Sequence, residues 1–596
     1  MDKKNPSFFM TMLNGINIVR LIIVNILFFT FLFVGLAFLA SLSQGGDESR
    51  PIDYGTILEI APIGTIIERE DEYEWMEVAF SEKKVYSYLS QIILAIKEAT
   101  VDEKIDALYL DFSYLRSLSS AHLDEIENAL IAFKKSGKPI WAYSTSYNIK
   151  DYYLASFAEH IGLDPMGEVD LEGFSYEGLY FKGMEEKFGL GFQTFHAGNS
   201  KGGVEPFSRK DMSPQVKENI GAMLFDMWGT YKSTVAHNIE KSEVEIENFA
   251  KKPYELLAKY GGNDALMAKG EGFISDMAER KKFKDIMKES LSQDSSHSLE
   301  FASYLDYIKN ISVKEKINKV GIIYLTGAIT ASKRSEMQNN VAVASDIAHL
   351  FEKACDDESI KAIVLRVDSG GGEVFASEIM RRALVKAKES GKPVVVSMGS
   401  VAASGAYWIS SHASYIFATR FTITGSIGVF MLRPNIHSFL QERLGITADG
   451  VNVLGREKTS IEPLNEEEIR KVALSINATY KDFIKTVSLG RSLDEEAVLP
   501  IAEGKVYSGK QAKKLSLIDE IGTFEDAVAK AAELANIEDF STVEVRKPLS
   551  PLNQAMKALL ESDASFNLEQ LKVLREWTDL QDKSGIYAYT PCRLIW

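Results

Sequence analysis

Apolar stretches alternate with amphipathic ones along most of this chain. In its second half, near-continuous apolar runs lie at Val320–Thr330, Ala362–Val367 and Val394–Met398. Between and after them, Phe375–Lys388 and Ala402–Ser410 carry apolar residues at helical spacing. Strands that are apolar on both faces and alternate with helices are typical of buried parallel sheets. The pattern therefore predicts an α/β fold.

The same order of elements occurs twice. The segment SGKPIWAYSTSYNIKDYYLAS, which starts at Ser136, matches SGKPVVVSMGSVAASGAYWIS, which starts at Ser390, at an offset of 254 residues (390 − 136). Upstream of each, DEKIDALYLDFS corresponds to DESIKAIVLRVDS. An internal repeat of this kind indicates a duplicated structural unit. We therefore expect two tandem domains, at 52–240 and 317–545, with a mostly helical, charged linker at 241–316 and a helical tail at 546–596.

An uncharged apolar stretch, LIIVNILFFTFLFVGLAFLA at Leu21–Ala40, precedes both repeats. It is long enough for a helix of about 20 residues to cross a bilayer. Basic residues lie before it and acidic residues after it: Lys3, Lys4 and Arg20, then Asp47 and Glu48. The positive-inside rule then keeps residues 1–20 in the cytoplasm, makes 21–42 a single-pass anchor and places both repeats across the membrane. A cleaved signal peptide is the alternative, although its apolar core is usually shorter, about 7–15 residues.

Composition excludes several kinds of protein. At 596 residues the chain is too long for one core. Its net charge of −17, from 67 Lys+Arg and 84 Asp+Glu, argues against nucleic-acid binding, which needs a basic surface. Cys355 and Cys592 form no CxxC pair, and the eight histidines include no HExxH motif. We therefore expect no metal, no cofactor and no disulfide on which the fold depends.

Ser404 lies in a run of small residues, GSVAASGAYWISS, at Gly399–Ser411. Small neighbours allow either close packing of a strand and a helix or the approach of a substrate backbone to the hydroxyl. At the fixed offset, the first repeat has Lys150 and has lost the small residues. The loss from one copy favours a chemical role for Ser404, with a packing serine as the alternative.

A nucleophilic serine needs hydrogen-bond donors for the oxyanion. RVDSGGGEVFAS, at Arg366–Ser377, places three glycines between a predicted strand and a predicted helix, where unshielded amides can bind an anion. Gly371, Gly372 and Gly405 are therefore candidate donors. A phosphate-binding loop is the alternative, but the Gly-Lys-Ser/Thr sequence that such loops require is missing.

The serine also needs a base. Ala402 and Ala406 flank it where the α/β-hydrolase motif has glycines, and His412 and His437 have no supporting motif. A Ser–Lys dyad performs the same proton transfers, provided that the lysine pKa falls from about 10.4 toward neutrality.

Two lysines occupy equivalent places in the repeats. GNSKGGVEPF contains Lys201 and GREKTSIEPL contains Lys458. Small uncharged residues surround Lys201, whereas Arg456 and Glu457 precede Lys458 and are typical of a solvated loop. Since an exposed lysine stays protonated, we predict Lys201 as the base and keep Lys458 as the alternative.

Together these motifs resemble the signal peptide peptidase A family (protease IV) in its long, duplicated bacterial form, within the Clp protease/crotonase superfamily. The resemblance covers nearly the whole chain and rests on GNSKGGVEPFSRKDMSP, SGGGEVFASE, AASGAYWIS and TGSIGVF. It implies two crotonase-like domains with Ser404 as the nucleophile, Lys201 as the base, an oxyanion loop at Gly371 and Gly372, and Ser426 orienting the amine.

The resemblance also implies a function. It is that of a serine endopeptidase of the bacterial inner membrane, with its catalytic domains on the periplasmic side, which degrades cleaved signal peptides and other short apolar peptides as a homotetramer. The chain has Ser369–Gly372 where the family usually has Ser-Pro-Gly-Gly. Single-copy relatives take their lysine from the same domain as the serine, which keeps Lys458 open. The sequence leaves open whether the dyad forms within one chain or between chains. The alternative functions are a proteolytically inactive membrane-tethered scaffold and an acyl-CoA enzyme.

Overall fold

The computed structural model describes residues 51–68, 85–292, 297–311, 315–332, 341–449, 451, 453 and 462–547, together with positions 25, 28 and 29. The elements described below belong to one compact unit, 51–69 and 86–547. Apart from those three positions, the predicted anchor at 21–42 lies outside the described residues, as does the tail beyond 547. Among the described residues, none of the helices combines the length and the apolar composition that a bilayer span requires.

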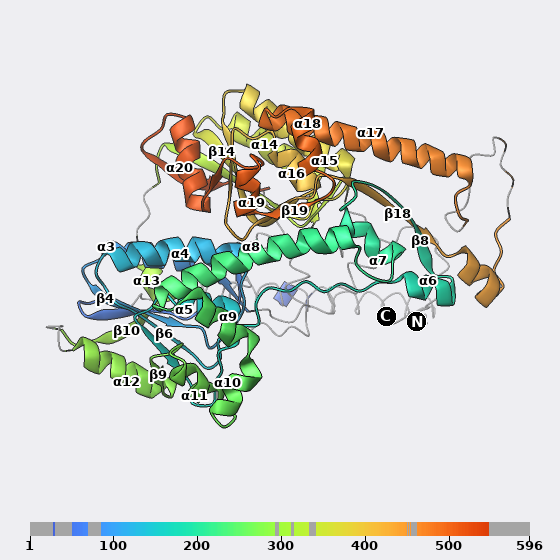
Figure 1. Cartoon of the computed structure of the whole chain (residues 1–596). Helices are drawn as coiled ribbons and strands as arrows, with labels where there is room; N and C mark the ends of the chain where they lie inside the picture. The colour runs from blue at the N-terminus through green and yellow to red at the C-terminus, as the bar shows by residue number, and fades with distance from the viewer. Residues whose placement is uncertain are drawn as a thin grey trace, which may run out of the picture. The chain divides into compact units, whose positions relative to one another are not determined.

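Within the described residues, the first domain has a six-stranded parallel sheet in the order β10–β1–β4–β6–β7–β9 (Figure 1). Its strands are β1 (Thr56–Ile60), β4 (Ile105–Asp111), β6 (Ile140–Ser144), β7 (His160–Leu163), β9 (Asp276–Met277) and β10 (Glu300–Ser303). A small sheet beside it contains β2 (Gly64–Ile67), β3 (Tyr86–Tyr88) and β5 (Leu115–Ser117).

Helices cover both faces of this sheet. On one face, Leu58 and Leu108 pack in a core with α3 (Leu89–Val101) and α4 (Ser120–Lys135). On the other face, Tyr109 packs against α12 (Arg280–Leu291). The remaining helices of this half are α5 (Ile149–Ala155), α6 (Lys182–Phe188), α7 (Glu205–Ser208), α8 (Pro214–Asn238), α9 (Glu243–Lys251), α10 (Pro253–Lys259), α11 (Asp264–Gly270), α12 (Arg280–Leu291) and α13 (Tyr304–Lys309).

The segment 241–316, expected to be a linker, is part of the first domain. Its helices are present, but β9 and β10 extend the sheet at both edges. Ile246 and Phe283 are fully buried in the two cores of this domain. The prediction was wrong because the charged residues of this segment cover its outer side and conceal how much of it is buried.

The described part of the second domain repeats the layered plan with an eight-stranded sheet. Its main path is β19–β17–β15–β14–β11–β21; β16 also pairs with β15, and β20 pairs with β16. Among these strands the β17–β19 pair is antiparallel. The strands are β11 (Asn318–Thr326), β14 (Ile360–Ser369), β15 (Val394–Ala403), β16 (Tyr415–Ala418), β17 (Ile423–Gly425), β19 (Val506–Ser508), β20 (Glu520–Ile521) and β21 (Phe540–Glu544). A separate pair consists of β12 (Ala328–Thr330) and β13 (Val341–Val343).

Alternate residues of the central strands face opposite cores. Leu365 packs in the core that includes residues of α14 (Ala344–Asp356) and α15 (Val374–Glu389), whereas Val364 packs against α20 (Phe524–Leu534). The central strands are therefore apolar along their length because both faces of the sheet are buried, as the sequence indicated. The α/β prediction is confirmed. The helices of this half are α14 (Ala344–Asp356), α15 (Val374–Glu389), α16 (Gly405–Ser410), α17 (Glu466–Arg491), α18 (Glu495–Val498), α19 (Gly509–Lys514) and α20 (Phe524–Leu534).

Two sets of contacts join the first half of the chain to the second half. Strand β8 (Gly191–Ala197) pairs antiparallel with β18 (Val429–Asn435) from one end to the other. Helix α8 lies along β19, where the Asn219 side chain both donates to and accepts from the backbone of Val506, at 3.0 and 2.8 Å. These contacts fix the first half of the chain against β18 and β19 of the second half.

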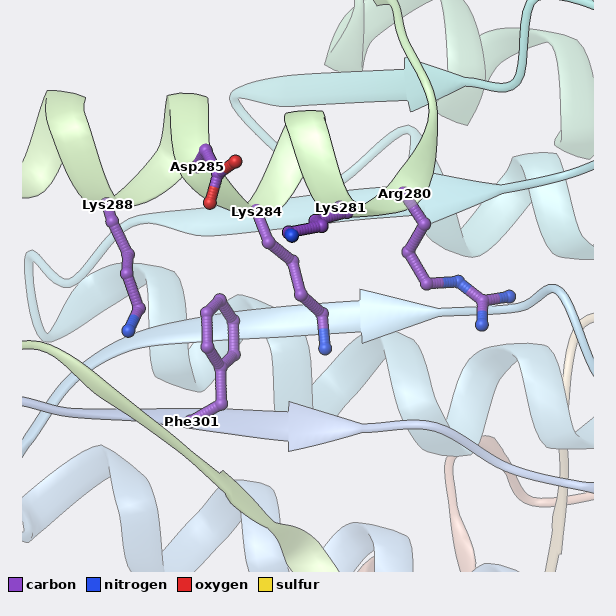
Figure 2. A pocket seen from close by; sticks show the side chains of 6 residues that line it. All are labelled: Arg280, Lys281, Lys284, Asp285, Lys288 and Phe301. Atoms are coloured by element: carbon purple, nitrogen blue, oxygen red, sulfur yellow. The ribbon is translucent and has the colours of Figure 1, made fainter.

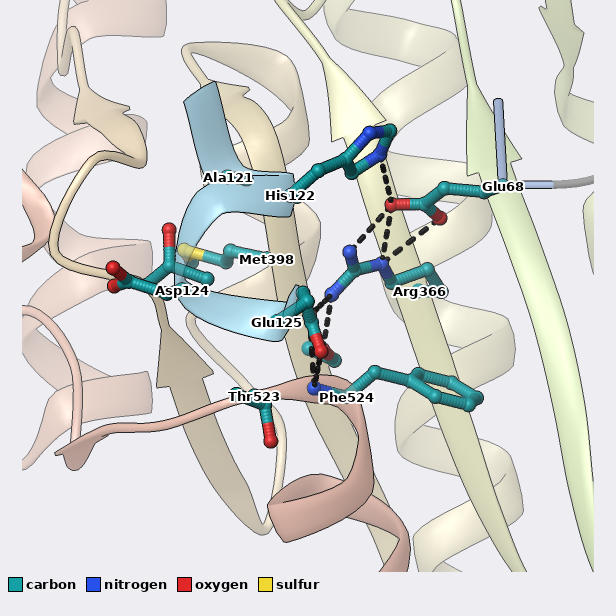
Figure 3. Close-up of polar contacts among 12 residues, drawn as sticks. Glu68, Ala121, His122, Asp124, Glu125, Arg366, Met398, Thr523 and Phe524 are labelled. Atoms are coloured by element: carbon teal, nitrogen blue, oxygen red, sulfur yellow. Dashed lines mark hydrogen bonds and ion pairs between the residues drawn. The ribbon is translucent and has the colours of Figure 1, made fainter. Parts of the chain in front are cut away.

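A buried ion network forms a third connection (Figure 3). Arg366 on β14 is 1% exposed; its Nε lies 2.9 Å from both carboxylate oxygens of Glu68, which follows β2, and its Nη1 lies 3.1 Å from Glu125 on α4. Burial opposes ionisation of Glu68, but Arg366 and His122 together hold its pKa below the usual range. Burial raises the pKa of Glu125 to about 7 despite Arg366.

Removal of Arg366 should destabilise the protein, because Glu68 and Glu125 would remain buried without their cation. We expect Arg366→Met to lower the free energy of unfolding by roughly 3–5 kcal/mol in urea denaturation. Arg382→Met is the control, since that side chain is 71% exposed beside Glu378, and its loss should cost at most about 1 kcal/mol. Equal effects of the two substitutions would contradict a structural role for the buried network.

Candidate active site

Ser404 lies at a sharp turn between β15 and α16. Its backbone has φ +55° and ψ −120°, and its N–H donates to the Gly425 carbonyl at 2.9 Å. A non-glycine residue in this conformation is strained by about 1–3 kcal/mol. The turn also explains why β15 extends to Ala403 and the helix starts at Gly405, although the sequence predicted a helix from Ala402. In α/β-hydrolases a similar strand-to-helix turn exposes the serine of a Gly-x-Ser-x-Gly motif. Here the turn forms without that motif.

The small residues around Ser404 permit close backbone contacts. A Cβ on Gly371 would lie 2.6 Å from the Gly405 nitrogen and 2.9 Å from the Ser404 Cβ. A Cβ on Gly405 would lie 2.4 Å from the Ser377 Oγ and 3.1 Å from the Gly372 nitrogen. Glycine is therefore required at both positions, and the oxyanion-loop candidates lie directly beside Ser404.

Two amides beside the serine have free donors. The neighbours of Gly372 bond with β12: Ile329 N–H donates to Gly371 O at 3.0 Å and Glu373 N–H donates to Ile329 O at 2.9 Å. In a parallel bridge this pattern turns the Gly372 N–H away from β12. Among the described residues, neither this N–H nor that of Gly405 has an acceptor. Together they can bind an oxyanion that forms next to Ser404.

Lys201 reaches Ser404 from the first half of the chain. Its Nζ lies 3.0 Å from the Ser404 Oγ, and it donates to the Ser426 carbonyl at 2.7 Å and the Ser426 Oγ at 2.9 Å. The residue is 5% exposed, and in the described part of the chain no carboxylate contributes to its pKa. Burial lowers the Lys201 pKa to about 7. A neutral amine has two hydrogens, which Ser426 can accept, and a lone pair, which can accept the Ser404 proton.

The β8–β18 pairing explains how residues far apart in sequence meet. Ala197, the last residue of β8, is paired with Val429, the first residue of β18. Lys201 follows shortly after β8, and Ser426 shortly precedes β18, so both loops leave the same end of the ribbon. Lys458, the alternative base, lies outside the described residues.

The first repeat has a different arrangement at the equivalent position. The Lys150 amine donates to the Leu118 carbonyl at 2.7 Å, and no hydroxyl replaces that of Ser404. Of the two histidines considered as bases, His412 has its pKa lowered to about 4 by burial and by Arg381. In the described part of the chain, no hydrogen bond joins His412 or His437 to Ser404. No group of His, Cys, Asp or Glu among the described residues could hold a metal ion.

A separate pocket of about 450 Å³ lies on the first domain beside α12 (Figure 2). Its lining is mostly cationic: Arg280, Lys281, Lys284, Asp285, Lys288 and Phe301. Carboxylates pair with these cations: Lys284 lies 2.6 Å from Glu59, and Arg280 lies 3.0 Å from Asp111. Because its lining includes neither Ser404 nor Lys201, this pocket is not the catalytic candidate.

No motif in the sequence points to the turn at Glu503–Gly504, which contacts the lysine loop. A Cβ on Gly504 would lie 2.6 Å from the Lys201 nitrogen and Cα. The turn follows Lys201 by some three hundred residues (503 − 201 = 302). A single glycine at such a distance carries no sequence signal, so this contact appears only in the folded chain.

Comparisons with known proteins match the same two parts of the chain. A family model described as peptidase family S49 matches residues 132–287, which include Lys201, and 386–538, which include Ser404. The chain is 36% identical to Protease 4 of Haemophilus influenzae, over 88% of this chain and 87% of that protein. It is 34% identical to Protease 4 of Salmonella typhi, over 88% and 85%. It is 27% identical to the chloroplastic serine protease SPPA of Arabidopsis thaliana, over 79% and 70%.

Lys201 should titrate near neutral pH in the folded protein, because its amine is buried without a carboxylate. In protein labelled with ¹³C at the lysine ε-carbons, we expect a signal with a midpoint of about 7. The signal should be missing from the Lys201→Arg variant, which assigns it. A Lys201 signal that titrates in the usual alkaline range would contradict the buried geometry.

Proposed function

Because the chain belongs to peptidase family S49 and is a serine peptidase of the protease 4 (signal peptide peptidase A) type, we propose that Ser404 and Lys201 form its catalytic dyad. The observation that carries the proposal is the 3.0 Å separation between the Lys201 Nζ and the Ser404 Oγ, with the amine buried. This combination satisfies the two requirements of a lysine base, which are contact with the hydroxyl and a neutral amine near pH 7.

The proposed reaction follows from these contacts. Lys201 accepts the Ser404 proton as the Oγ attacks the carbonyl carbon of a peptide bond. The Gly372 and Gly405 amides donate to the oxyanion of the tetrahedral intermediate. As the carbon–nitrogen bond breaks, the Lys201 ammonium gives its proton to the leaving amine, and an acyl-enzyme remains on Ser404. Lys201 then takes a proton from the water that attacks the ester, and returns it to Ser404 as the acid leaves.

Apolar peptides are the proposed substrates. Phe375, which follows the glycine loop, is 70% exposed. The Phe430 ring lies 5.9 Å from the Lys201 Nζ and is also exposed. Exposed aromatic side chains after the glycine loop and beside the lysine suit an extended apolar chain better than a charged one. Remnant signal peptides have this character, which supports them as the substrate class.

The proposed location is the bacterial inner membrane. The apolar stretch at 21–42 would anchor the chain with its N-terminus in the cytoplasm, and the catalytic domains would lie on the periplasmic side. An enzyme held there meets its substrates where they remain after cleavage. We propose a homotetramer, as the family resemblance implies.

Substitution of either dyad residue should abolish peptidase activity. For Ser404→Ala and Lys201→Ala we expect kcat/KM on an apolar peptide to fall by at least about 10³-fold. Lys458→Ala is the matched control and should remain largely active. Loss of activity in Lys458→Ala alone would show that the base is wrongly assigned. A fluorophosphonate that fails to label Ser404 in the unsubstituted protein would favour the inactive scaffold.

The pH dependence should report the amine. A base works only when deprotonated, so kcat/KM should rise with pH through about 7, where Lys201 loses its proton, and then level off. The rate at which a fluorophosphonate modifies Ser404 should follow the same curve, because it needs the same activated hydroxyl. An activity that is highest well below pH 6 would exclude an amine base.

A further inference from the structure

Three loops beside the dyad contact one another, and the proton transfer between Lys201 and Ser404 does not account for these contacts. The loop before Lys201, the loop after Ser426 and the turn at Glu503–Gly504 contact one another through backbone atoms. The Gly504 N–H donates to the Ile427 carbonyl at 2.8 Å, and the Ser426 N–H donates to the Lys505 carbonyl at 2.7 Å. The turn therefore lies between the strand end that carries Lys201 and the residue that accepts its hydrogens.

The turn holds the lysine loop by two hydrogen bonds. The Glu503 carbonyl accepts from the Ser200 N–H at 2.7 Å, and its carboxylate accepts from the Asn199 N–H at 2.7 Å. Tyr480 on α17 fixes Glu503 in turn, since its hydroxyl accepts from the Glu503 N–H at 3.1 Å. Both residues that precede Lys201 are thus bonded to a single residue of the second domain.

Glycines on both sides permit this approach. Gly504 has φ +75°, and a Cβ there would lie 2.6 Å from the Lys201 nitrogen and Cα and 2.7 Å from its Cβ. Gly198 has φ +105°, and a Cβ there would lie 2.8 Å from the Glu503 carbonyl carbon. Backbone atoms cannot yield as a flexible side chain does. Any side chain at 504 therefore has to displace Lys201.

We infer that the turn Glu503–Gly504 is a positioning element that holds Lys201 against Ser404, an inference that rests on the proposed function of Lys201 as the general base. The turn does not touch the reacting atoms. It acts by fixing the backbone from which the lysine side chain extends. A displaced amine loses contact with the Ser404 hydroxyl and becomes more exposed to water. Its distance from the hydroxyl and its pKa therefore both increase.

The test is the pH dependence of Ser404 modification by a fluorophosphonate, in the full-length protein. In Gly504→Ala we expect the rate to fall by about 10²-fold, the cost of a small misplacement of a catalytic group. We also expect the acidic limb of the profile to move to higher pH, because a solvated lysine returns toward its usual pKa. Gly391→Ala is the matched control: its φ is +92°, with no atom within 4 Å of the added Cβ, so it introduces the same backbone strain and should keep the limb in place.

A second pair of variants covers the case in which Gly504→Ala does not fold. Glu503→Ala removes the acceptor for the Asn199 N–H and should move the limb in the same direction. Glu503→Gln keeps a carbonyl oxygen there and should restore the original profile. An unmoved limb in both Gly504→Ala and Glu503→Ala, or an equal shift in Gly391→Ala, would overturn the inference. If Lys201→Ala kept the rate of the unsubstituted protein, the proposed function itself would fail, which is a different outcome.

Discussion

The structure depends on one contact, a buried amine against a hydroxyl. Among the described residues no carboxylate compensates for the burial of Lys201, so the folded protein bears the cost of removing its amine from water. That cost is what lowers its pKa and makes lysine usable as a base. The β8–β18 pairing and the contacts with Ser426 bring this amine to Ser404, where it is buried.

The protein offsets that cost elsewhere. The strained conformation of Ser404 is a second cost, and close backbone contacts at Gly371 and Gly405 hold the turn in place. Apolar cores on both faces of each sheet stabilise the fold and offset the cost of the buried amine and the strained serine. The buried Arg366 network links α4 and the residue that follows β2 to the second sheet, because Glu125 and Glu68 both pair with Arg366 on β14.

Much of the plan could be read from the sequence. The α/β fold follows from strands that are apolar on both faces. The duplication pointed to Ser404 because the other copy has Lys150 in its place, and to Lys201 because its counterpart Lys458 has charged neighbours. The β8–β18 pairing could not be foreseen, since both strands are only partly buried and their apolar pattern is weak. The end of β15 was misplaced because alanine favours helices, whereas the turn at Ser404 and pairing with β17 hold Ala402 and Ala403 extended.

The most direct measurement changes the basicity of one amine and leaves its position unchanged. In protein whose Cys355 and Cys592 are replaced by serine, Lys201→Cys can be alkylated with 2-bromoethylamine, which places a thioether analogue of lysine with a less basic amine at position 201. If that amine takes the Ser404 proton, alkylation restores activity and the acidic limb of kcat/KM moves to lower pH than in the lysine form. Restored activity with an unmoved limb would show that some other group accepts the proton.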